Sequence, residues 1–372
     1  MKITNVRVIR VEGGMRSGIA LYETARGGLP PGQATPYQAV FTLIETDEGL
    51  TGLSYGGSRG IKEAGQLLIG EDPTRYEYLW ERLHTRLYLR ERLDVIAVLD
   101  LALWDLIGKI RNAPVYELLG GPTRERVRAY VGMLGFSTEP EAAARRSLEF
   151  VEQGFTALKW YLPNNERAGN QGLAHNVAII RAVREAVGPD IDIMVDWLLS
   201  DPTRNSLIYA IKLAQRLEEF HPTWIEEPLS FEDLDAHAAL ARATRIPLAF
   251  GEHWMSRWGI RGLIDAGATV LQPDPNGAGG ITEMRKIIAV ASVHGLSVVP
   301  HSNESCRNNL HLLFAQSERI CPLGEWGAKI NANVQWFYRD FYQPRDGFFE
   351  PPLGPGFGYE LDESKIERRV EL

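Results

Sequence analysis

The order of apolar and polar residues along the chain predicts strands in the first part of the sequence. Apolar and polar residues alternate there, with the period of half-buried strands, over Ile3–Val11, Ala39–Glu45 and Thr51–Tyr55. Residues 12–36, between the first two strands, are rich in Gly and Pro and have few apolar side chains. Loops of that length inside a compact domain are usually functional lids or disordered, so we expect a long mobile loop there.

Helical spacing then replaces this alternation. From Tyr76 to Leu119 the apolar residues recur every three to four positions, and between Val95 and Ile107 they lie nearly all round the predicted helix. A helix that is apolar on every side has no face for solvent, so this segment predicts a buried helix. Strands followed by helices predict an α+β unit for this first part of the chain.

A repeating pattern begins after Gly120-Gly121-Pro122. Short apolar runs alternate with helical patterns such as Asn176–Val187 and Ile281–His294, and the run Val127–Val131 brings the total to eight strand–helix units. Eight units predict a closed (β/α)8 barrel, although an open doubly wound sheet shows the same alternation. The other seven runs each reach a charged or imidazole side chain: Lys159, Asp196, Glu226, Glu252, Asp274, His301 and Glu325.

Composition and charge narrow the class of protein. The 372 residues carry 40 Lys and Arg against 48 Asp and Glu, which gives a formal charge of −8. This acidic balance, together with the lack of a basic block, argues against nucleic-acid binding. The start, MKITNVRVIRV, lacks the apolar core of a signal peptide, and no apolar run approaches the roughly 18 residues of a membrane span. The two cysteines, Cys306 and Cys321, have no metal-site spacing. We therefore expect a cytoplasmic, soluble protein with a small-molecule partner.

Three of the strand-end residues are carboxylates on successive strands. In a parallel barrel Asp196, Glu226 and Glu252 share the C-terminal face, where active sites lie. Three adjacent carboxylates repel one another unless a positive charge lies between them, and an all-oxygen set suits Mg²⁺. The alternative is that each acid caps the helix after its strand. Capping explains one such acid well, but it gives no reason for three acids at the same level on successive strands.

The next two strands end in Asp274 and His301. A carboxylate that accepts from one imidazole nitrogen fixes the tautomer and raises the basicity of the ring, which leaves the other nitrogen for proton transfer. His253, directly after Glu252, belongs to the same face and is a candidate for substrate binding. The segment Gly277–Gly280 lacks the spacing of a nucleotide-binding turn and predicts a tight connection between strand and helix.

A hard cation beside a His–Asp base suits one kind of chemistry. Removal of the proton next to a carboxylate creates a dianionic enediolate, and a divalent cation that chelates the carboxylate neutralises that charge. The residues thus predict Mg²⁺-assisted proton abstraction α to a carboxylate.

At this point the sequence resembles the enolase superfamily, specifically its mandelate-racemase-like subgroup, over nearly its whole length. The motifs that carry the resemblance are MVDW, WIEEP, GEHW, QPDPNGAGG and VVPHSN. The resemblance implies a barrel at 123–344 and an α+β capping domain at 1–122, completed by 345–372. It implies a homo-oligomer, and specificity loops around residues 14–32 and Tyr55–Arg59. It also implies residue roles: Mg²⁺ ligands Asp196, Glu226 and Glu252, the acid/base dyad His301 and Asp274, and Glu325 as the acid that hydrogen-bonds the substrate carboxylate.

One departure from the family pattern bears on the reaction. The family has Lys-x-Lys on the second barrel strand, whereas this chain has Lys159-Trp160-Tyr161, in which Trp160 should face the helices. A racemase needs a base on each face of the substrate, and Tyr, with a pKa of about 10, is a poor one. The sequence therefore looks most like an acid-sugar dehydratase of the rhamnonate-dehydratase kind. Either His301 performs both proton transfers, or Tyr161 or Lys159 takes the proton and His301 acts as the acid.

The alternatives and the substrate stay open from sequence alone. A racemase or epimerase of a related acid is the second candidate, and a non-catalytic barrel that binds a ligand is the third. Which sugar acid is used depends on loop residues, for which the candidates are Arg16, Arg59, Asn303 and Arg307.

Overall fold

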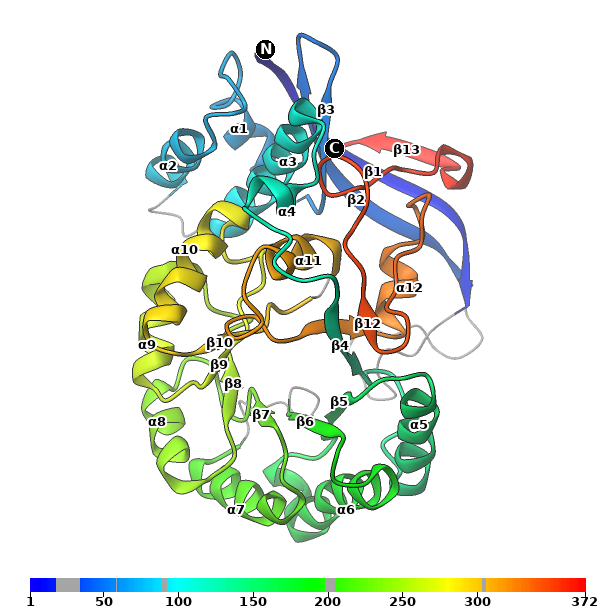
Figure 1. The fold of residues 1–372 in the computed structure, drawn as a ribbon, viewed down its shortest axis with the longest axis vertical. Helices are drawn as coiled ribbons and strands as arrows, with labels where there is room; N and C mark the ends of the chain where they lie inside the picture. Colours follow the sequence, from blue (N-terminus) through cyan, green and yellow to red (C-terminus); the bar gives the residue numbers. More distant parts are fainter. Residues whose placement is uncertain (18–33, 58, 88–91, 198–204, 303–305) are drawn as a thin grey trace.

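The computed structural model describes residues 1–17, 34–57, 59–87, 92–197, 205–302 and 306–372. An antiparallel sheet of four strands lies at one end of the molecule (Figure 1). Its order is β13-β1-β2-β3, so a strand from the C-terminal end completes a sheet built by the N-terminal end. The strands are β1 (Ile3–Ser17), β2 (Ala34–Thr46), β3 (Thr51–Tyr55) and β13 (Arg368–Glu371).

The prediction of a loop over residues 12–36 is wrong at both ends of that range. β1 continues to Ser17, which pairs with Ala34 of β2, so the two strands form one long ladder. The Gly-rich part of β1 is accommodated by a register shift between Gly13 and Met15, where Gly14 takes a φ of 63°. Such a bulge absorbs an extra residue without ending the strand pairing. Residues 18–33 lie outside the described part of the chain.

Helices follow the first three strands, as the sequence predicts. Every residue from Val95 to Gly108 is buried, which confirms the buried helix. This helix, α3, lies between the N-terminal sheet and the rest of the molecule, and two carboxylates, Asp100 and Asp105, are among its buried side chains. The helices of this part are α1 (Ile61–Gly65), α2 (Tyr76–Leu87), α3 (Leu93–Arg111) and α4 (Val115–Leu118).

Eight parallel strands follow, one for each predicted strand–helix unit. Their order is β10-β9-β8-β7-β6-β5-β4-β11, and the backbone N–H of Val298 on β10 donates to the carbonyl of Ile320, just before β11 (2.7 Å). The sheet therefore curls until its two edge strands approach each other, as the barrel prediction requires. The strands are β4 (Val127–Gly132), β5 (Ala157–Tyr161), β6 (Asp192–Asp196), β7 (Trp224–Glu226), β8 (Leu248–Phe250), β9 (Val270–Leu271), β10 (Ser297–Val298) and β11 (Gly324–Gly327).

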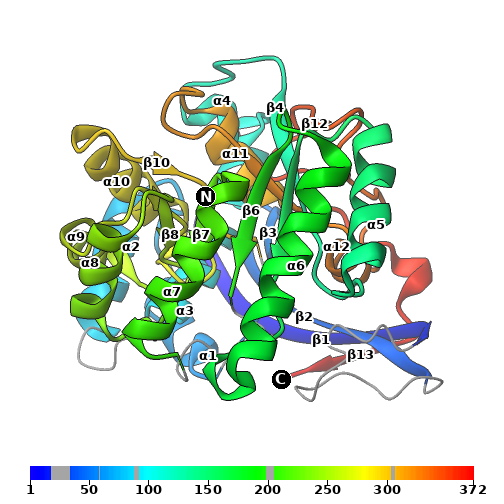
Figure 2. The ribbon, with the colours of Figure 1, turned by 90° about the horizontal axis from the view of Figure 1, so that it is seen from below.

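Helices surround these strands (Figures 1 and 2). Helices α7 and α8 start at side-chain caps: Ser206 accepts from the N–H of Tyr209 at α7, and Asp233 accepts from the N–H of Ala236 at α8. The helices are α5 (Pro140–Glu152), α6 (Gly169–Val187), α7 (Leu207–Leu217), α8 (Leu234–Ala243), α9 (Ser256–Asp265), α10 (Gly280–Val293), α11 (Cys306–Phe314) and α12 (Ile330–Val334).

The C-terminal segment connects both parts. β12 (Phe348–Phe349) first pairs with β4 of the barrel. The chain then crosses to the N-terminal part, where the N–H of Phe357 donates to Asp105 (2.9 Å) and β13 pairs with β1. This path supports the division that we propose, a barrel at 123–344 and a cap of 1–122 completed by 345–372. Within the described residues, no helix has both the length and the apolar content needed to cross a bilayer.

Candidate active site

The parallel strands bring the predicted polar residues to one end of the barrel. Asp196 on β6 pairs in register with Glu226 on β7, and Tyr161 on β5 pairs with Asp196. Because parallel strands in register end at the same level, these side chains gather at the carboxyl ends of the strands. Lys159 on β5 and Glu325 on β11 also lie within their strands. Three more of the predicted residues follow their strands by two or three positions: Glu252, Asp274 and His301.

Lys159 lies at the centre of one set of acids. Its Nζ is 2.6 Å from Oε1 of Glu226, 2.9 Å from Oε1 of Glu325 and 3.4 Å from Oδ2 of Asp196. The side chain is only 1% exposed. Burial alone would lower the pKa of Lys159, but Glu226 and Glu325 raise it well above its ordinary value. Lys159 is therefore a fixed positive charge among three carboxylates.

His301 lies between two acids. Its Nδ1 is 3.1 Å from Oδ2 of Asp274, as predicted, and its Nε2 is 3.0 Å from Oε2 of Glu252. Burial lowers the pKa of His301, but Glu252 and Asp274 outweigh burial and raise it well above its ordinary value. Burial likewise raises the pKa of Glu252, but His301 lowers it to about 2. In the protein without metal, these two carboxylates therefore favour the charged form of the imidazole.

The three acids predicted as Mg²⁺ ligands are divided between these two sets. Asp196 and Glu226 converge on the ammonium of Lys159, whereas Glu252 contacts His301 and His253 (Nε2 to Oε1, 3.2 Å). Within the described part of the chain, no three His, Cys, Asp or Glu side chains are placed to share one metal ion. The carboxylates are therefore near one another, each with a cationic partner from the protein.

Tyr161 and Trp160 point to opposite sides of β5. The indole Nε1 of Trp160 donates to Oγ of Ser147 on α5 (2.9 Å), so Trp160 faces the helices, as the alternation of the strand predicts. Tyr161 is buried, and its ring centroid is 5.5 Å from Nζ of Lys159. Burial raises the pKa of Tyr161 well above its ordinary value, although Lys159 opposes the shift. Its phenol is neutral at any physiological pH.

Three residues at the site were missed by the sequence reasoning. Gln272 donates from Nε2 to Oε2 of Glu226 (2.8 Å), and Asn276 donates from its backbone N–H and its Nδ2 to Oδ1 of Asp274 (both 2.9 Å). The order Asp-Pro-Asn favours such a turn, and Gln272 shares the strand parity of Asp274, so both had a signal in the sequence.

The third missed residue, Glu227, has an unusual backbone. Its φ is 43°, a left-handed conformation that costs free energy for a non-glycine residue, and its Oε1 accepts the N–H of Gly251 (3.1 Å). Burial, together with the nearby Glu252, raises the pKa of Glu227 to about 8. A strained, buried acid directly after Glu226 is a typical feature of a functional site.

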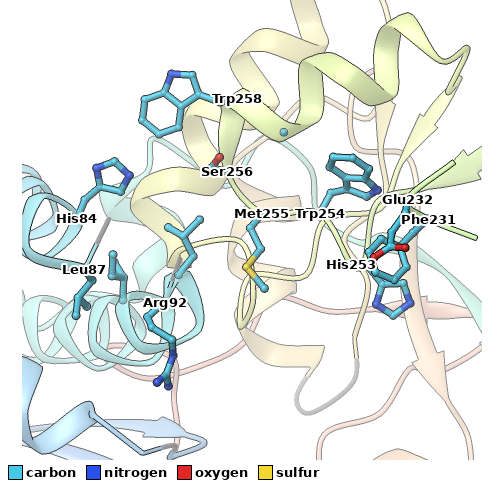
Figure 3. Close-up of a pocket in the computed structure, with 13 residues that line it drawn as sticks. His84, Leu87, Arg92, Phe231, Glu232, His253, Trp254, Met255, Ser256 and Trp258 are labelled. Carbon is cyan, nitrogen blue, oxygen red and sulfur yellow. The ribbon is translucent and has the colours of Figure 1, made fainter. Parts of the chain in front are cut away.

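A pocket of about 1200 Å³ opens beside His253 (Figure 3). Its walls come from α2 and the start of α3 on one side, and from the segments after β7 and β8 on the other. His253 lines the pocket, packs against the ring of Phe231 (centroids 5.1 Å apart) and contacts Glu252. The pocket therefore lies between the barrel and the cap, and His253 connects it to Glu252.

The other residues predicted to contact substrate are placed less directly. Arg59 is exposed, and its carbonyl accepts from Arg92, which lines the pocket. Arg307 is buried and donates to the carbonyls of Gly358 and Asp340, so it holds the C-terminal segment. The side chain of Arg16 and the whole of Asn303 lie outside the described residues.

The fold and site define a class of protein: a (β/α)8 barrel with a cluster of carboxylates, a lysine and a histidine at the carboxyl ends of its strands, beside an α+β cap. Residues 142–365 match the family described as "Enolase C-terminal domain-like". Residues 32–120 match the "Mandelate racemase / muconate lactonizing enzyme, N-terminal domain". The chain therefore belongs to the enolase superfamily, in its mandelate racemase and muconate lactonizing enzyme group, which confirms the resemblance seen in the motifs.

Named relatives cover almost the whole chain. It is 32% identical over 362 residues to a D-galactonate dehydratase from Cronobacter sakazakii, which spans 90% of this chain and 92% of the relative. Among solved structures, a member of the enolase superfamily from Salmonella Typhimurium has a TM-score of 0.84 at 26% identity and covers 100% and 99% of the two chains. The 3,6-anhydro-D-galactonate cycloisomerase from Zobellia galactanivorans has a TM-score of 0.81 at 26% identity and covers 99% and 100%.

Proposed function

We propose that this protein is a Mg²⁺-dependent acid-sugar dehydratase. It removes the proton α to the carboxylate of an aldonic acid and eliminates the 3-hydroxyl, which gives a 2-keto-3-deoxy acid and water. The observation that carries the proposal is the line of Asp274, His301 and Glu252 at the carboxyl ends of three successive barrel strands. The identity to a D-galactonate dehydratase over 90% of the chain supports the same reaction.

The acids fit a magnesium ion by their chemistry. Mg²⁺ takes oxygen ligands, and Asp196, Glu226 and Glu252 supply them from three successive strands. Asp196 and Glu226 already converge on one cation, the ammonium of Lys159, so the site is built to hold positive charge. When bound, the ion neutralises the charge that develops on the substrate carboxylate.

We assign the proton transfers to His301. The raised pKa values keep Lys159 charged and Tyr161 neutral, so neither is a base near neutral pH. Asp274 accepts from Nδ1 of His301, and Nε2 faces Glu252. A cation held by Glu252 would compete with the imidazolium for that carboxylate, which would lower the pKa of His301 and free Nε2 to accept the proton from the substrate. The proton taken from C2 then protonates the departing 3-hydroxyl, and the enol product tautomerises to the 2-keto acid.

We assign the main contact with the substrate carboxylate to Lys159 rather than to Glu325. Glu325 accepts from the N–H of Ser302 (2.9 Å) and pairs with Lys159. Burial raises the pKa of Glu325, but Lys159 and His301 lower it below its ordinary value, so Glu325 is ionised. An ionised acid repels a substrate carboxylate, whereas the ammonium of Lys159 attracts it. Glu325 then holds Lys159 in place and borders the same position.

The substrate class follows from the space beside the site. The rest of the sugar chain extends past His253 into the pocket that is lined by Phe231 and Trp254 (Figure 3). Aromatic faces suit the C–H faces of a polyhydroxy chain, while His253 and Glu232 offer hydrogen bonds to its hydroxyls. Because the chain is similar to a D-galactonate dehydratase, D-galactonate is the first acid to test.

The test is a screen of mono- and diacid sugars with Mg²⁺, in which 2-keto-acid formation is measured. We expect turnover of at least one aldonic acid, loss of turnover with EDTA, and loss of turnover in His301→Asn while calorimetry still detects Mg²⁺ binding. Solvent-deuterium exchange without a keto product would instead show an epimerase or racemase. Ligand binding without either reaction would show a binding protein, and substantial turnover by His301→Asn would refute its assigned role.

A further inference from the structure

Buried hydrogen bonds join the cap to the barrel at the start of α10. Asp100 on α3, 1% exposed, accepts the backbone N–H of Thr282 at Oδ2 (3.0 Å) and its hydroxyl at Oδ1 (2.6 Å). The indole of Trp104 donates to the same hydroxyl oxygen (2.9 Å). The indole of Trp80 on α2 donates to the carbonyl of Gly279 (2.8 Å). Four buried hydrogen bonds therefore join the cap to one turn of one barrel helix.

Asp100 does for α10 what an N-cap residue usually does. The N-cap of α10 is Gly279, which has no side chain, so the helix supplies no cap of its own. The first N–H groups of a helix lack partners within it, and Asp100 accepts one of them from a different part of the chain. A Cβ on Gly280 would lie 2.3 Å from Oδ2 of Asp100, so this close approach depends on glycine.

The segment that leads to α10 carries Asp274. Only five residues separate Asp274 from Gly280, and three backbone hydrogen bonds close them into a compact turn. The N–H groups of Gly277 (3.0 Å) and Ala278 (2.7 Å) donate to the carbonyl of Asp274, and that of Gly280 donates to the carbonyl of Pro275 (3.0 Å). Within this turn, Asn276 binds Oδ1 of Asp274 and leaves Oδ2 for His301. The direction of the Asp274 carboxylate thus follows from where α10 begins.

The other partner of His301 is tied to the same turn of α10. Glu283 accepts the N–H of Arg257 (2.8 Å) and pairs with its guanidinium. Arg257 lies five residues after Glu252, at the beginning of α9. Both acids that contact His301 therefore belong to segments anchored at Thr282 and Glu283.

We propose that Asp100 is a positioning residue for the reaction: through Thr282 it fixes the start of α10 and thereby aims Asp274 at His301. The kinetic part of this inference rests on the proposed dehydratase function. A displacement of about 1 Å at a catalytic group costs about 100-fold in rate, so loss of this anchor lowers kcat. A residue that only joined the cap to the barrel would change stability instead.

Asp105 provides a matched control on the same helix. It is as buried as Asp100, and it accepts from the N–H groups of Leu53 (2.8 Å) and Phe357 (2.9 Å) and pairs with Lys109 (2.7 Å). These partners all belong to the cap and the C-terminal segment. Asp105→Asn therefore weakens the cap without touching the start of α10.

The experiment compares Asp100→Asn, Thr282→Val, Thr282→Ser and Asp105→Asn in the full-length protein. We expect kcat to fall about 10- to 100-fold in Asp100→Asn and Thr282→Val, with KM changed less than about 3-fold. Thr282→Ser keeps the hydroxyl and should restore kcat. Asp105→Asn should keep kcat within about 3-fold of the wild type, even where its Tm falls as far as that of Asp100→Asn. If Asp100→Asn does not fold, the Thr282→Val and Thr282→Ser pair decides.

A second readout needs no substrate. The low-field NMR resonance of the Nδ1 proton of His301, assigned by its loss in His301→Asn, should shift in Asp100→Asn and Thr282→Val but not in Asp105→Asn or Thr282→Ser. If the wild type turns over no acid sugar, the proposed function fails, while this resonance still tests the positioning. The inference is overturned if Asp100→Asn and Thr282→Val change kcat and this resonance no more than Asp105→Asn does.

Discussion

The ammonium of Lys159 lies 2.6 Å from Oε1 of Glu226, and both side chains are 1% exposed. This contact is the shortest of the three that Lys159 makes with acids from β6, β7 and β11. A buried charge without a partner is costly, so each of these carboxylates depends on a nearby cation. In the protein without metal, Lys159 provides that cation.

Replacement of Lys159 by Met should therefore make folding depend on magnesium. Removal of one partner of a buried ion pair costs about 3–5 kcal/mol, because the remaining charge is unpaired. Mg²⁺ binds the folded state and offsets part of that loss. We expect Lys159→Met to unfold at lower denaturant concentration than the wild type in EDTA, and to gain more stability than the wild type from added Mg²⁺.

A surface ion pair supplies the control for this measurement. Lys286 lies 2.8 Å from Glu77, whose side chain is half exposed, and such pairs contribute little. Lys286→Met should change the free energy of unfolding by less than about 1 kcal/mol, with or without Mg²⁺. If Lys159→Met were as stable as wild type in EDTA, the acids around it would not carry the charge assigned to them.

The sequence was sufficient for the barrel and for the ends of its strands, because both follow from local patterns. Apolar runs that end in polar residues place Asp196, Glu226, Asp274 and His301 at one face in any parallel barrel. The contact of His301 with Asp274 followed from adjacent strands. These predictions need only the direction and order of strands.

Other features depend on which side chains meet, and no local pattern shows that. The sequence offered Lys159 as a candidate to take the proton, and only the folded chain shows that it pairs with three acids from three strands. The cap for α10 comes from Asp100, 182 residues before Thr282 in the sequence. β1 extends to Ser17 because its partner strand continues, although its own Gly-rich sequence indicated a loop. Each of these is a tertiary contact that overrides a local preference.

Tyr161→Phe tests which group transfers the proton. Because burial keeps the pKa of Tyr161 well above its ordinary value, its phenol is neutral and does not remove a proton from carbon near pH 7. We expect the variant to keep kcat, and the rate of solvent-deuterium incorporation at C2, within about 10-fold of the wild type. A general base contributes about 100- to 10,000-fold, so a loss of that size would assign the base to Tyr161.

His311 should make the stability of the protein fall in acid. It is fully buried on α11, its Nδ1 accepts the N–H of Tyr116 (3.1 Å), and burial lowers its pKa from 6.5 to about 3. The folded state thus holds His311 neutral where the unfolded chain binds a proton. Its contribution is complete above pH 6.5 and is lost as the pH falls from 6.5 towards 3. At about pH 5 this loss is roughly 2 kcal/mol.

The measurement is urea unfolding at a series of pH values for the wild type and for His311→Gln. The glutamine does not titrate and its side-chain oxygen still accepts a hydrogen bond, so the free energy of unfolding should fall less steeply below pH 6.5. His294→Gln, at the exposed end of α10, is the control and should keep the slope of the wild type. Equal slopes for His311→Gln and the wild type would show that His311 is not the group responsible.

Gly280→Ala and Gly295→Ala separate backbone strain from collision at the start of α10. Both glycines have positive φ, 82° and 69°, so alanine at either position costs about 1–2 kcal/mol for the left-handed backbone. At Gly295 the added Cβ meets nothing within 4 Å, whereas at Gly280 it would lie 2.3 Å from Oδ2 of Asp100. The carboxylate would have to leave Thr282, which breaks two buried hydrogen bonds.

We expect Gly280→Ala to lose at least about 2 kcal/mol more than Gly295→Ala in urea unfolding, since each buried group left without a partner costs about 1–3 kcal/mol. Equal losses for the two variants would mean that Asp100 moves aside freely, and that the start of α10 does not depend on its contact with α3.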